Sequence, residues 1–251
     1  MLLFGFLLFF WAQESQSLSA LRRLQVLPLG APTHHVQGID TDGERLWVTS
    51  VDAPHRKGFL YEFSLAGGKL NRQIEIQDGE RFHPGGISAD ETSLWIPIAE
   101  YRRNSTSIIQ RRNKKTWNVE LQFAVPDHIG CVAVTPDFVI GGNWDARTFY
   151  LWDHRGTLIR KVANATPNAY QDIKFHAGKI VAGGLLPGRV GAIDLLQLPS
   201  FDLVRRLDTG KTDRGVTFTR EGMAIYRNQL LLLPEDNPSR LFVFEWSLEP
   251  R

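Results

Sequence analysis

The stretch HPGGISADETSLWIPIAE, residues 83–100, decides the fold because its pattern occurs five times along the chain. Four other segments of the same length align with it without gaps: HVQGIDTDGERLWVTSVD (35–52), HIGCVAVTPDFVIGGNWD (128–145), AYQDIKFHAGKIVAGGLL (169–186) and TREGMAIYRNQLLLLPED (219–236). Each copy has a small or polar residue followed by an apolar one, then a polar turn and a second apolar run. This pattern predicts two strands joined by a hairpin.

Two more strands complete most copies of the repeat. A third apolar run follows every copy, and a fourth follows the first four. The fifth copy has no room for a fourth strand before the chain ends, but ALRRLQVLPLG (20–30) precedes the first copy and resembles DLVRRLDTG (202–210). The copies are spaced by 48, 45, 41 and 50 residues, measured between the aligned residues Gly38, Gly86, Cys131, Asp172 and Gly222.

Four-stranded units of this length are typical of propeller blades. The sequence therefore predicts an all-β, five-bladed β-propeller whose N-terminal strand completes the last blade. Closure of the ring matters physically because an open ring would leave two sheet edges unpaired. Almost no helix is expected, since no 3.6-residue periodicity is sustained outside the first residues.

The remaining features of the chain concern its organisation and location. The apolar run Leu2–Ala12 is too short to span a bilayer, and it predicts a signal peptide over residues 1–20, cleaved between Ala12 and Ala20. We therefore expect a secreted or periplasmic monomer with a single propeller domain at 21–251 and no membrane span after cleavage. A net charge of +2 with scattered basic residues predicts no nucleic-acid partner.

Three copies begin with a histidine and end with a carboxylate 17 residues later. The pairs are His35 with Asp52, His83 with Glu100, and His128 with Asp145. The fourth copy has lost both members, which is what a direct bond between them predicts, because a buried carboxylate without a partner is costly. The simplest interpretation is a structural His–acid brace within each blade. YLWD (150–153) resembles the strand end of WD-repeat propellers, which use a comparable link.

Residues that depart from the repeat are the better candidates for function. Asp172 stands where three other copies have glycine, and its blade lacks the His–acid pair. We take Asp172, His83 and His128 as candidate catalytic residues, with Asp172 or a histidine as general base. Candidate ligand-binding residues share the same predicted mouth of the central channel: His35, Gln37, Tyr101, Asn143, Trp144, Gln171, Glu221 and Asn237. The opposing interpretation is a polar plug filled with ordered water.

A metal is a further candidate at this mouth. Histidines on consecutive blades, or the carboxylates beside them, are ligand types that bind divalent cations. No H-E-x-x-H sequence or EF-hand loop is present, so a divalent cation at the channel mouth is a hypothesis without a local motif.

Several segments carry a resemblance to known families. HPGGIS, LWIPIAEYRRNST, DHIG, YQDI and LLPEDNPSRLFVFE resemble a family of exported propeller proteins of uncharacterised function. More distantly, VQGIDTDGERLWVTS (36–50) resembles a blade of five-bladed glutaminyl cyclotransferases, and HPGGIS resembles lactonases of the gluconolactonase type. The metal-binding residues of the lactonases have no counterparts that can be placed here.

The sequence leaves three functions open. The first is a small-ligand or hydrolase-type site, lactonase-like or esterase-like, at the polar mouth of the channel. The second, implied by the resemblance, is a glutaminyl cyclotransferase-like enzyme. The third is a non-catalytic interaction platform. A small molecule or peptide is the expected partner, and the fold alone does not choose among these functions or decide whether the protein is an enzyme.

Overall fold

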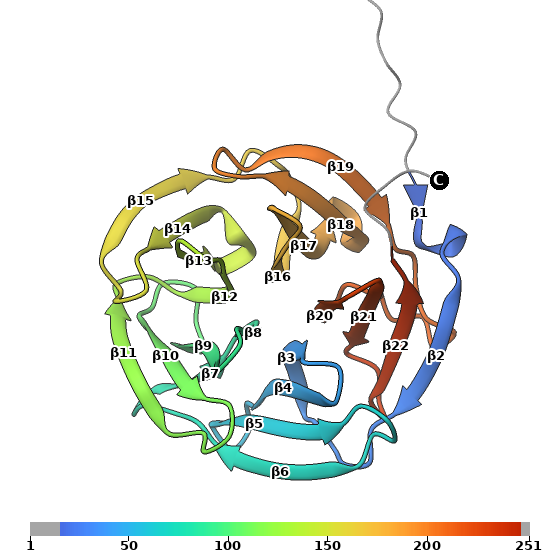
Figure 1. Cartoon of the computed structure of the whole chain (residues 1–251), viewed down its shortest axis with the longest axis horizontal. Coiled ribbons are helices and arrows are strands. Elements are labelled where there is room, and N and C mark those ends of the chain that lie inside the picture. The colour runs from blue at the N-terminus through green and yellow to red at the C-terminus, as the bar shows by residue number, and fades with distance from the viewer. Residues whose placement is uncertain (1–15, 247–251) are drawn as a thin grey trace, which may run out of the picture.

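The chain forms five β-sheets arranged around a central axis, as Figure 1 shows. The computed structural model describes residues 16–246 of the 251-residue chain. The prediction of a five-bladed propeller is confirmed, as is the near absence of helix, since the described residues contain only three short 3-10 turns. Among these residues, no helix is long and apolar enough to cross a bilayer.

The blades follow one another along the chain, each running from the axis outward. Blade 1 consists of β3 (His35–Thr41), β4 (Arg45–Asp52), β5 (Lys57–Ser64) and β6 (Leu70–Glu75). Blade 2 consists of β7 (Arg81–Pro84), β8 (Ser88–Ala89), β9 (Ser93–Glu100), β10 (Ser107–Asn113) and β11 (Val119–Val125). Blade 3 consists of β12 (Ile129–Val134), β13 (Val139–Asn143), β14 (Thr148–Trp152) and β15 (Leu158–Ala163).

The last two blades both use N-terminal segments. Blade 4 consists of β16 (Ala169–His176), β17 (Lys179–Leu186), β18 (Val190–Gln197) and β19 (Asp202–Asp208), with β1 (Gln16–Ser17) added outside. Blade 5 consists of β20 (Glu221–Tyr226), β21 (Gln229–Pro234), β22 (Arg240–Glu245) and, as its outer strand, β2 (Arg23–Pro28). The antiparallel pairing of β2 with β22 confirms the predicted closure of the ring.

The N-terminal boundary of the folded domain lies earlier than the predicted residue 21. β1 pairs in parallel with β19, and Leu18, in the 3-10 turn that follows, is buried. Residues 16–20 are therefore part of the propeller. The rest of the predicted signal peptide, residues 1–15, lies outside the described residues.

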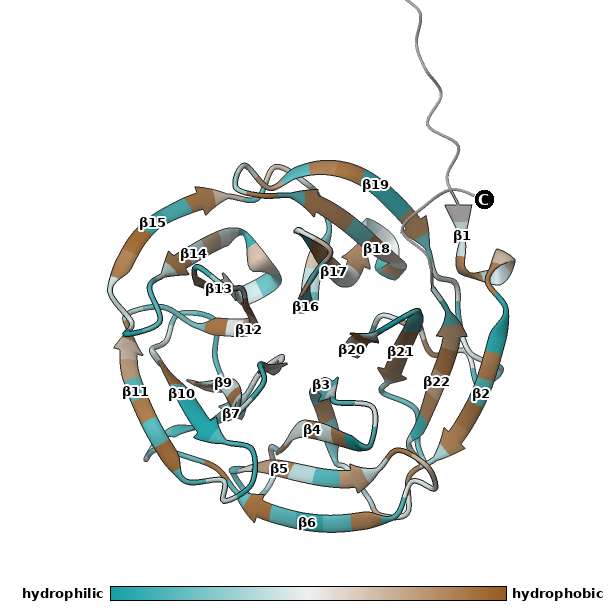
Figure 2. Cartoon of the chain, viewed as in Figure 1, coloured by the Kyte–Doolittle hydropathy of each residue, from teal (hydrophilic) through white to brown (hydrophobic). Residues whose placement is uncertain are grey.

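The hydrophobic core consists of five clusters, one between each pair of neighbouring blades. Inner strands are buried on both faces because each blade packs against two others, and β9 is buried along nearly its whole length. Outer strands such as β6 alternate between half-buried and exposed residues. Figure 2 shows this difference as brown inner strands and an outer ring of alternating colours.

The axis is closed by backbone rather than by an open channel. The Gly86 N–H donates to the Gly130 carbonyl at 2.8 Å, and the Val132 N–H donates to the Gly86 carbonyl at 3.0 Å, so blades 2 and 3 are hydrogen-bonded at the centre. A Cβ on Gly86 would lie 2.6 Å from Asp172 Oδ1 and 2.8 Å from Cys131 Cβ. The two glycines are therefore required by close packing at the axis, since a Cβ on Gly85 would overlap the Gly130 carbonyl oxygen.

We predict that Gly86→Ala destabilises the fold by about 1–3 kcal/mol, because the added methyl overpacks the axis. Gly67→Ala is the matched control, since a Cβ there meets nothing within 4 Å, and it should change stability by less than about 0.5 kcal/mol. Urea unfolding of both variants measures the difference. Equal stability of the two variants would contradict the close-packed axis.

Candidate functional site

A polar cup lies at one end of the closed axis. It encloses a cavity of about 280 Å³. Most of the predicted site residues line it: His35, Gln37, His83, Tyr101, His128, Trp144, Gln171 and Glu221. They come together because the first residues of the innermost strands and the loops after the second strands lie on the same face of the propeller. We call this cavity the cup.

A shared backbone position directs several side chains into the cup. A register shift interrupts β3 between Val36 and Gly38 and β16 between Tyr170 and Asp172, which leaves Gln37 and Gln171 as bulged residues. Such bulges re-aim side chains. In blade 5 the aligned residue is Glu221, and there the ladder is regular but Glu221 has φ of 108°. A non-glycine residue in that conformation costs on the order of 1–3 kcal/mol, and such strain is frequent at ligand and active sites.

The predicted His–acid braces are wrong. His35 pairs across the ladder with Val51, and His83 pairs with Ala99. Side chains alternate between faces along a strand, so the next residue, Asp52 or Glu100, points to the opposite face from its histidine.

The third brace fails for a different reason. Asp145 lies in a 3-10 turn, η2 (Trp144–Ala146), with φ of 59°. Its carboxylate accepts from Arg103 at 2.7 Å, while His128 contacts other groups. The acids of the other two copies also bond locally, Asp52 to His55 at 2.8 Å and Glu100 to Arg102 at 2.5 Å.

Asp172 is not a candidate base, which corrects the assignment made from the sequence. Its carboxylate is fully buried below the cup. Oδ2 accepts from the backbone N–H groups of Ile39 and Met223 at 3.2 and 3.1 Å. Oδ1 accepts from the Ile173 N–H at 2.9 Å and from Lys174 Nζ at 2.5 Å. Every contact is a donor, which favours the carboxylate, although burial raises the pKa of Asp172 to about 7. The group does not line the cup, so it has no place for a substrate.

Two other candidates also lie outside the cup. The Asn143 side chain donates to Asp127 at 3.1 Å and accepts from the Thr148 N–H at 2.8 Å, so it supports the loop of blade 3. Asn237 lines a neighbouring cavity instead.

Two neutral imidazoles form one side of the cup. His83 Nε2 lies 2.8 Å from Gln37 Oε1, and the Gln37 amide nitrogen donates to the Val36 carbonyl at 3.0 Å. His83 Nε2 is therefore the donor, and its buried Nδ1 carries a lone pair that no described residue contacts. Burial, helped by the neighbouring histidines, lowers the pKa of His83 well below its ordinary value.

His128 has the opposite tautomer. Its Nδ1 lies 2.9 Å from the Arg102 carbonyl oxygen, which can only accept, so Nδ1 carries the proton and Nε2 carries the lone pair. Burial lowers the pKa of His128, although the bond to the Arg102 carbonyl acts against it. The His83 and His128 rings lie 5.3 Å apart, and Tyr101 and Trp144 pack against them.

The opposite side of the cup is acidic. Glu221 is 7% exposed, and its carboxylate makes no hydrogen bond with any residue in 16–246; its ion pair with Arg220 is long, at 3.9 Å. Burial raises the pKa of Glu221 to about 7, and the charges of Glu235 and Asp172 act in the same direction. Such a carboxyl exchanges its proton near neutral pH.

His35 and Glu235 form an ion pair beside Glu221. His35 Nδ1 lies 3.0 Å from Glu235 Oε1, and Arg220 binds the other Glu235 oxygen at 2.6 Å. Burial acts to lower the pKa of His35, but the contact with Glu235 and the charge of Glu221 outweigh it and raise that pKa. The contact with His35 lowers the pKa of Glu235.

Glu235 was missed in the sequence, although strand alternation offered a signal. It is the seventeenth residue of its copy, the position aligned with Trp144. In the first two copies this position, Val51 and Ala99, lies directly across the ladder from the histidine, so it shares a face with the residues of the cup.

One set of residues in the described part of the chain could hold a divalent cation. Ligand atoms of His35, Glu221 and Glu235 all lie within 4.8 Å of one another. Arg220 and His35 already balance the charge of Glu235. We therefore treat this set as an ion-pair cluster, and the predicted cation stays a prediction.

These features define the class of the protein as a five-bladed propeller with a closed axis and one polar cup. The chain belongs to a family of unknown function, DUF6454, whose model matches residues 24–175. No curated protein sequence matches it significantly.

Solved structures share the fold at low sequence identity. Myxococcus xanthus glutaminyl cyclase matches with a TM-score of 0.68 and 13% identity over 90% of this chain and 97% of that one. The tail fiber of Staphylococcus aureus phage P68 matches with a TM-score of 0.57 and 16% identity over 93% of this chain and 54% of that one. At these identities the likeness concerns the fold alone.

We predict that His83 is energetically coupled to Gln37 and not to Glu100. Gln37→Ala and His83→Ala should be non-additive by at least about 0.5 kcal/mol, since the two side chains share a buried hydrogen bond. His83→Ala and Glu100→Ala should add to within about 0.5 kcal/mol. Urea unfolding of the two double-mutant cycles tests this, and a larger coupling in the second cycle would restore the brace.

Proposed function

We propose that the cup is an acid–base active site for a small neutral or cationic substrate, with Glu221 as the group that accepts and returns a proton. The observation that carries this proposal is the state of the Glu221 carboxylate. It is buried, it lacks a hydrogen bond in the described part of the chain, and it lines the same cavity as His83 and His128. Buried polar groups are usually satisfied, and a group that exchanges protons with a substrate must be free to do so.

The charges around the cup limit the substrate. The residues that line it include Glu221 and Asp145 but no lysine or arginine. A phosphate or carboxylate substrate would therefore meet repulsion, because the positive charge of His35 is already paired with Glu235. An amine or a neutral amide fits better, with the amine toward Glu221 and the amide toward the imidazole lone pairs.

Cyclisation of an N-terminal glutamine is the reaction that these groups fit best. The substrate ammonium first releases one proton to water. As the resulting amine attacks the side-chain amide carbon, its nitrogen gives a second proton to Glu221. The carbon–nitrogen bond of the amide then breaks, and ammonia leaves with the proton that Glu221 returns. Glu221 begins and ends as a carboxylate, and the products are a pyroglutamyl residue and ammonia. The similar fold of a glutaminyl cyclase agrees with this reaction, but the proposal rests on the residues of the cup.

The direct test is turnover of glutaminyl peptides, lactones and esters by purified protein, with ammonia release as the readout for the peptides. We expect glutaminyl peptides to be turned over. Glu221→Gln should lower kcat/KM by about 10²–10⁴-fold, which is the usual worth of a general acid–base group. Because the pKa of Glu221 is about 7 and the carboxylate is the active form, kcat/KM should fall as the pH drops through 7.

Glu91→Gln is the matched control, since Glu91 is exposed in the hairpin between β8 and β9; it should leave kcat/KM unchanged. Circular dichroism of both variants excludes loss of fold as the cause. Turnover of a lactone or ester in place of the peptides would overturn cyclisation while keeping the acid–base site. No turnover and no thermal shift with any of these compounds would overturn the site itself and favour the interaction platform.

A further inference from the structure

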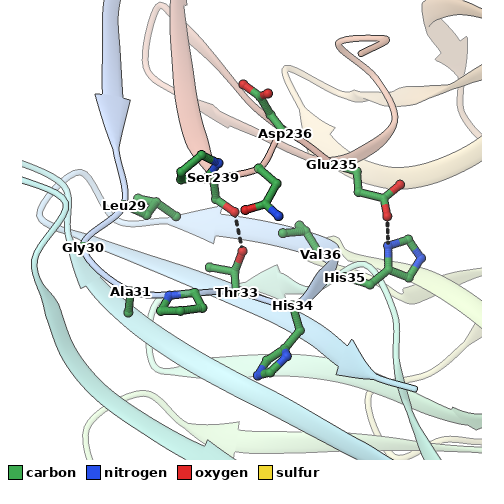
Figure 3. Close-up of a pocket in the computed structure, with 13 residues that line it drawn as sticks. Leu29, Gly30, Ala31, Thr33, His34, His35, Val36, Glu235, Asp236 and Ser239 are labelled. Atoms are coloured by element: carbon green, nitrogen blue, oxygen red, sulfur yellow. Dashed lines mark hydrogen bonds and ion pairs between the residues drawn. The ribbon is translucent and has the colours of Figure 1, made fainter. Parts of the chain in front are cut away.

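A second and larger cavity opens beside the cup at the seam where the ring closes. It has a volume of about 810 Å³. One wall is the segment 29–36, which connects β2 to β3, and the other is the loop 235–239 between β21 and β22. We call this cavity the seam groove; Figure 3 shows the residues that line it.

The seam groove and the cup share one wall residue, His35, whose ion-pair partner Glu235 lines the groove. Figure 3 places the ion pair between them at one end of the groove, away from Leu29 and Gly30 at the other end. A ligand in the cup therefore has a path into the groove past these two side chains. The cup alone, at about 280 Å³, is at the lower limit for a drug-sized ligand, whereas the groove is well within that range.

The walls of the groove are braced in place. Thr33 Oγ1 and Ser239 Oγ lie 2.6 Å apart, and the Leu29 N–H donates to the Ser239 carbonyl at 3.0 Å. Both bonds join the two walls directly. A groove that is already formed costs little ordering when a ligand binds.

The lining of the groove selects one kind of ligand. Short apolar residues such as Ala31 and Val36 alternate with hydroxyl groups from Thr33 and Ser239. The lining residues include no lysine or arginine to attract an anionic chain and no phenylalanine, tyrosine or tryptophan to stack on a sugar. The Thr33 and Ser239 hydroxyls bond to each other, and the Glu235 carboxylate pairs with His35 and Arg220, so the polar groups of the lining are held in fixed positions. A peptide, with amide groups and small side chains in alternation, matches this surface.

We propose that the seam groove holds the body of an elongated peptide whose free N-terminal amine lies in the cup beside Glu221 and Glu235. This inference rests on the proposed function, because it assigns the amine to the acidic side of the cup. It goes further in naming the substrate class as peptides of several residues rather than free amino acids or amides.

The test uses peptides that begin with alanine, which cannot cyclise, so binding is measured without turnover. A hexapeptide labelled with fluorescein at its C-terminal lysine is compared with a labelled Ala-Lys dipeptide and with the N-acetylated hexapeptide by fluorescence anisotropy. We expect the free hexapeptide to bind at least tenfold more tightly than either of the others. Equal affinity of hexapeptide and dipeptide would overturn the groove, and equal affinity of the acetylated peptide would overturn the placement of the amine.

A matched pair of variants locates the binding surface. Ala31→Trp fills the seam groove and should reduce the ratio of hexapeptide to dipeptide affinity to about one. Ala53→Trp is the control, because Ala53 is likewise half-buried but lines a different cavity with Arg56 and Glu80; the ratio should stay unchanged. An unchanged ratio in Ala31→Trp would overturn the groove even if Glu221→Gln abolishes turnover. If Ala31→Trp reduces the ratio of hexapeptide to dipeptide affinity to about one but Glu221→Gln retains full turnover, the groove is supported and the catalytic role of Glu221 is overturned.

Discussion

The buried carboxylate of Asp172 is the interaction on which the centre of the molecule depends. It accepts backbone N–H groups from blade 1 and blade 5, and its partner Lys174 donates to the Ile87 carbonyl of blade 2 at 2.6 Å. An isolated buried charge would be very costly, and only a full set of donors makes it tolerable. Glycine at position 86 leaves room for this side chain, while glycine at the aligned positions 38 and 222 allows close packing against Gly86 and Ile39. Asp172 thus joins blades 1, 4 and 5 directly, and its partner Lys174 adds blade 2.

Closure of the axis determines the chemistry above it. Because the channel has a floor, the cup is a blind cavity in which Glu221 is shielded from water on most sides. Burial is the main cause of its raised pKa, and the neighbouring carboxyl groups of Glu235 and Asp172 act in the same direction. The two acids therefore have opposite roles that follow from their partners. Asp172 is enclosed by four donors and does not line the cup, whereas Glu221 lines the cup, makes no hydrogen bond with the described residues and can exchange a proton with a ligand there.

The fold could be predicted from the sequence because repetition is visible without knowledge of contacts. The 18-residue copies and the strand that closes the ring from 20–30 both reappear in the structure. The meaning of individual residues was harder to predict. Asp172 was singled out correctly as a departure from the repeat, but its partners, Ile39 and Met223, are brought to it only by the ring. The histidines were paired with the wrong acids because a count of 17 residues does not reveal which face a side chain takes across a ladder. Glu235 was overlooked for the same reason.

The central claim, that Glu221 is a proton-exchanging group at neutral pH, can be measured directly. A protein labelled with ¹³C at the glutamate side-chain carboxyls would be titrated by NMR between pH 4 and 9, with the Glu221→Gln spectrum identifying the signal. We expect the Glu221 signal to titrate near pH 7, because burial raises the pKa of this carboxyl to about 7. A Glu221 signal that titrates near the ordinary value for glutamate, about 4.3, would contradict it, because the carboxyl would then be a permanently charged part of the ion-pair cluster.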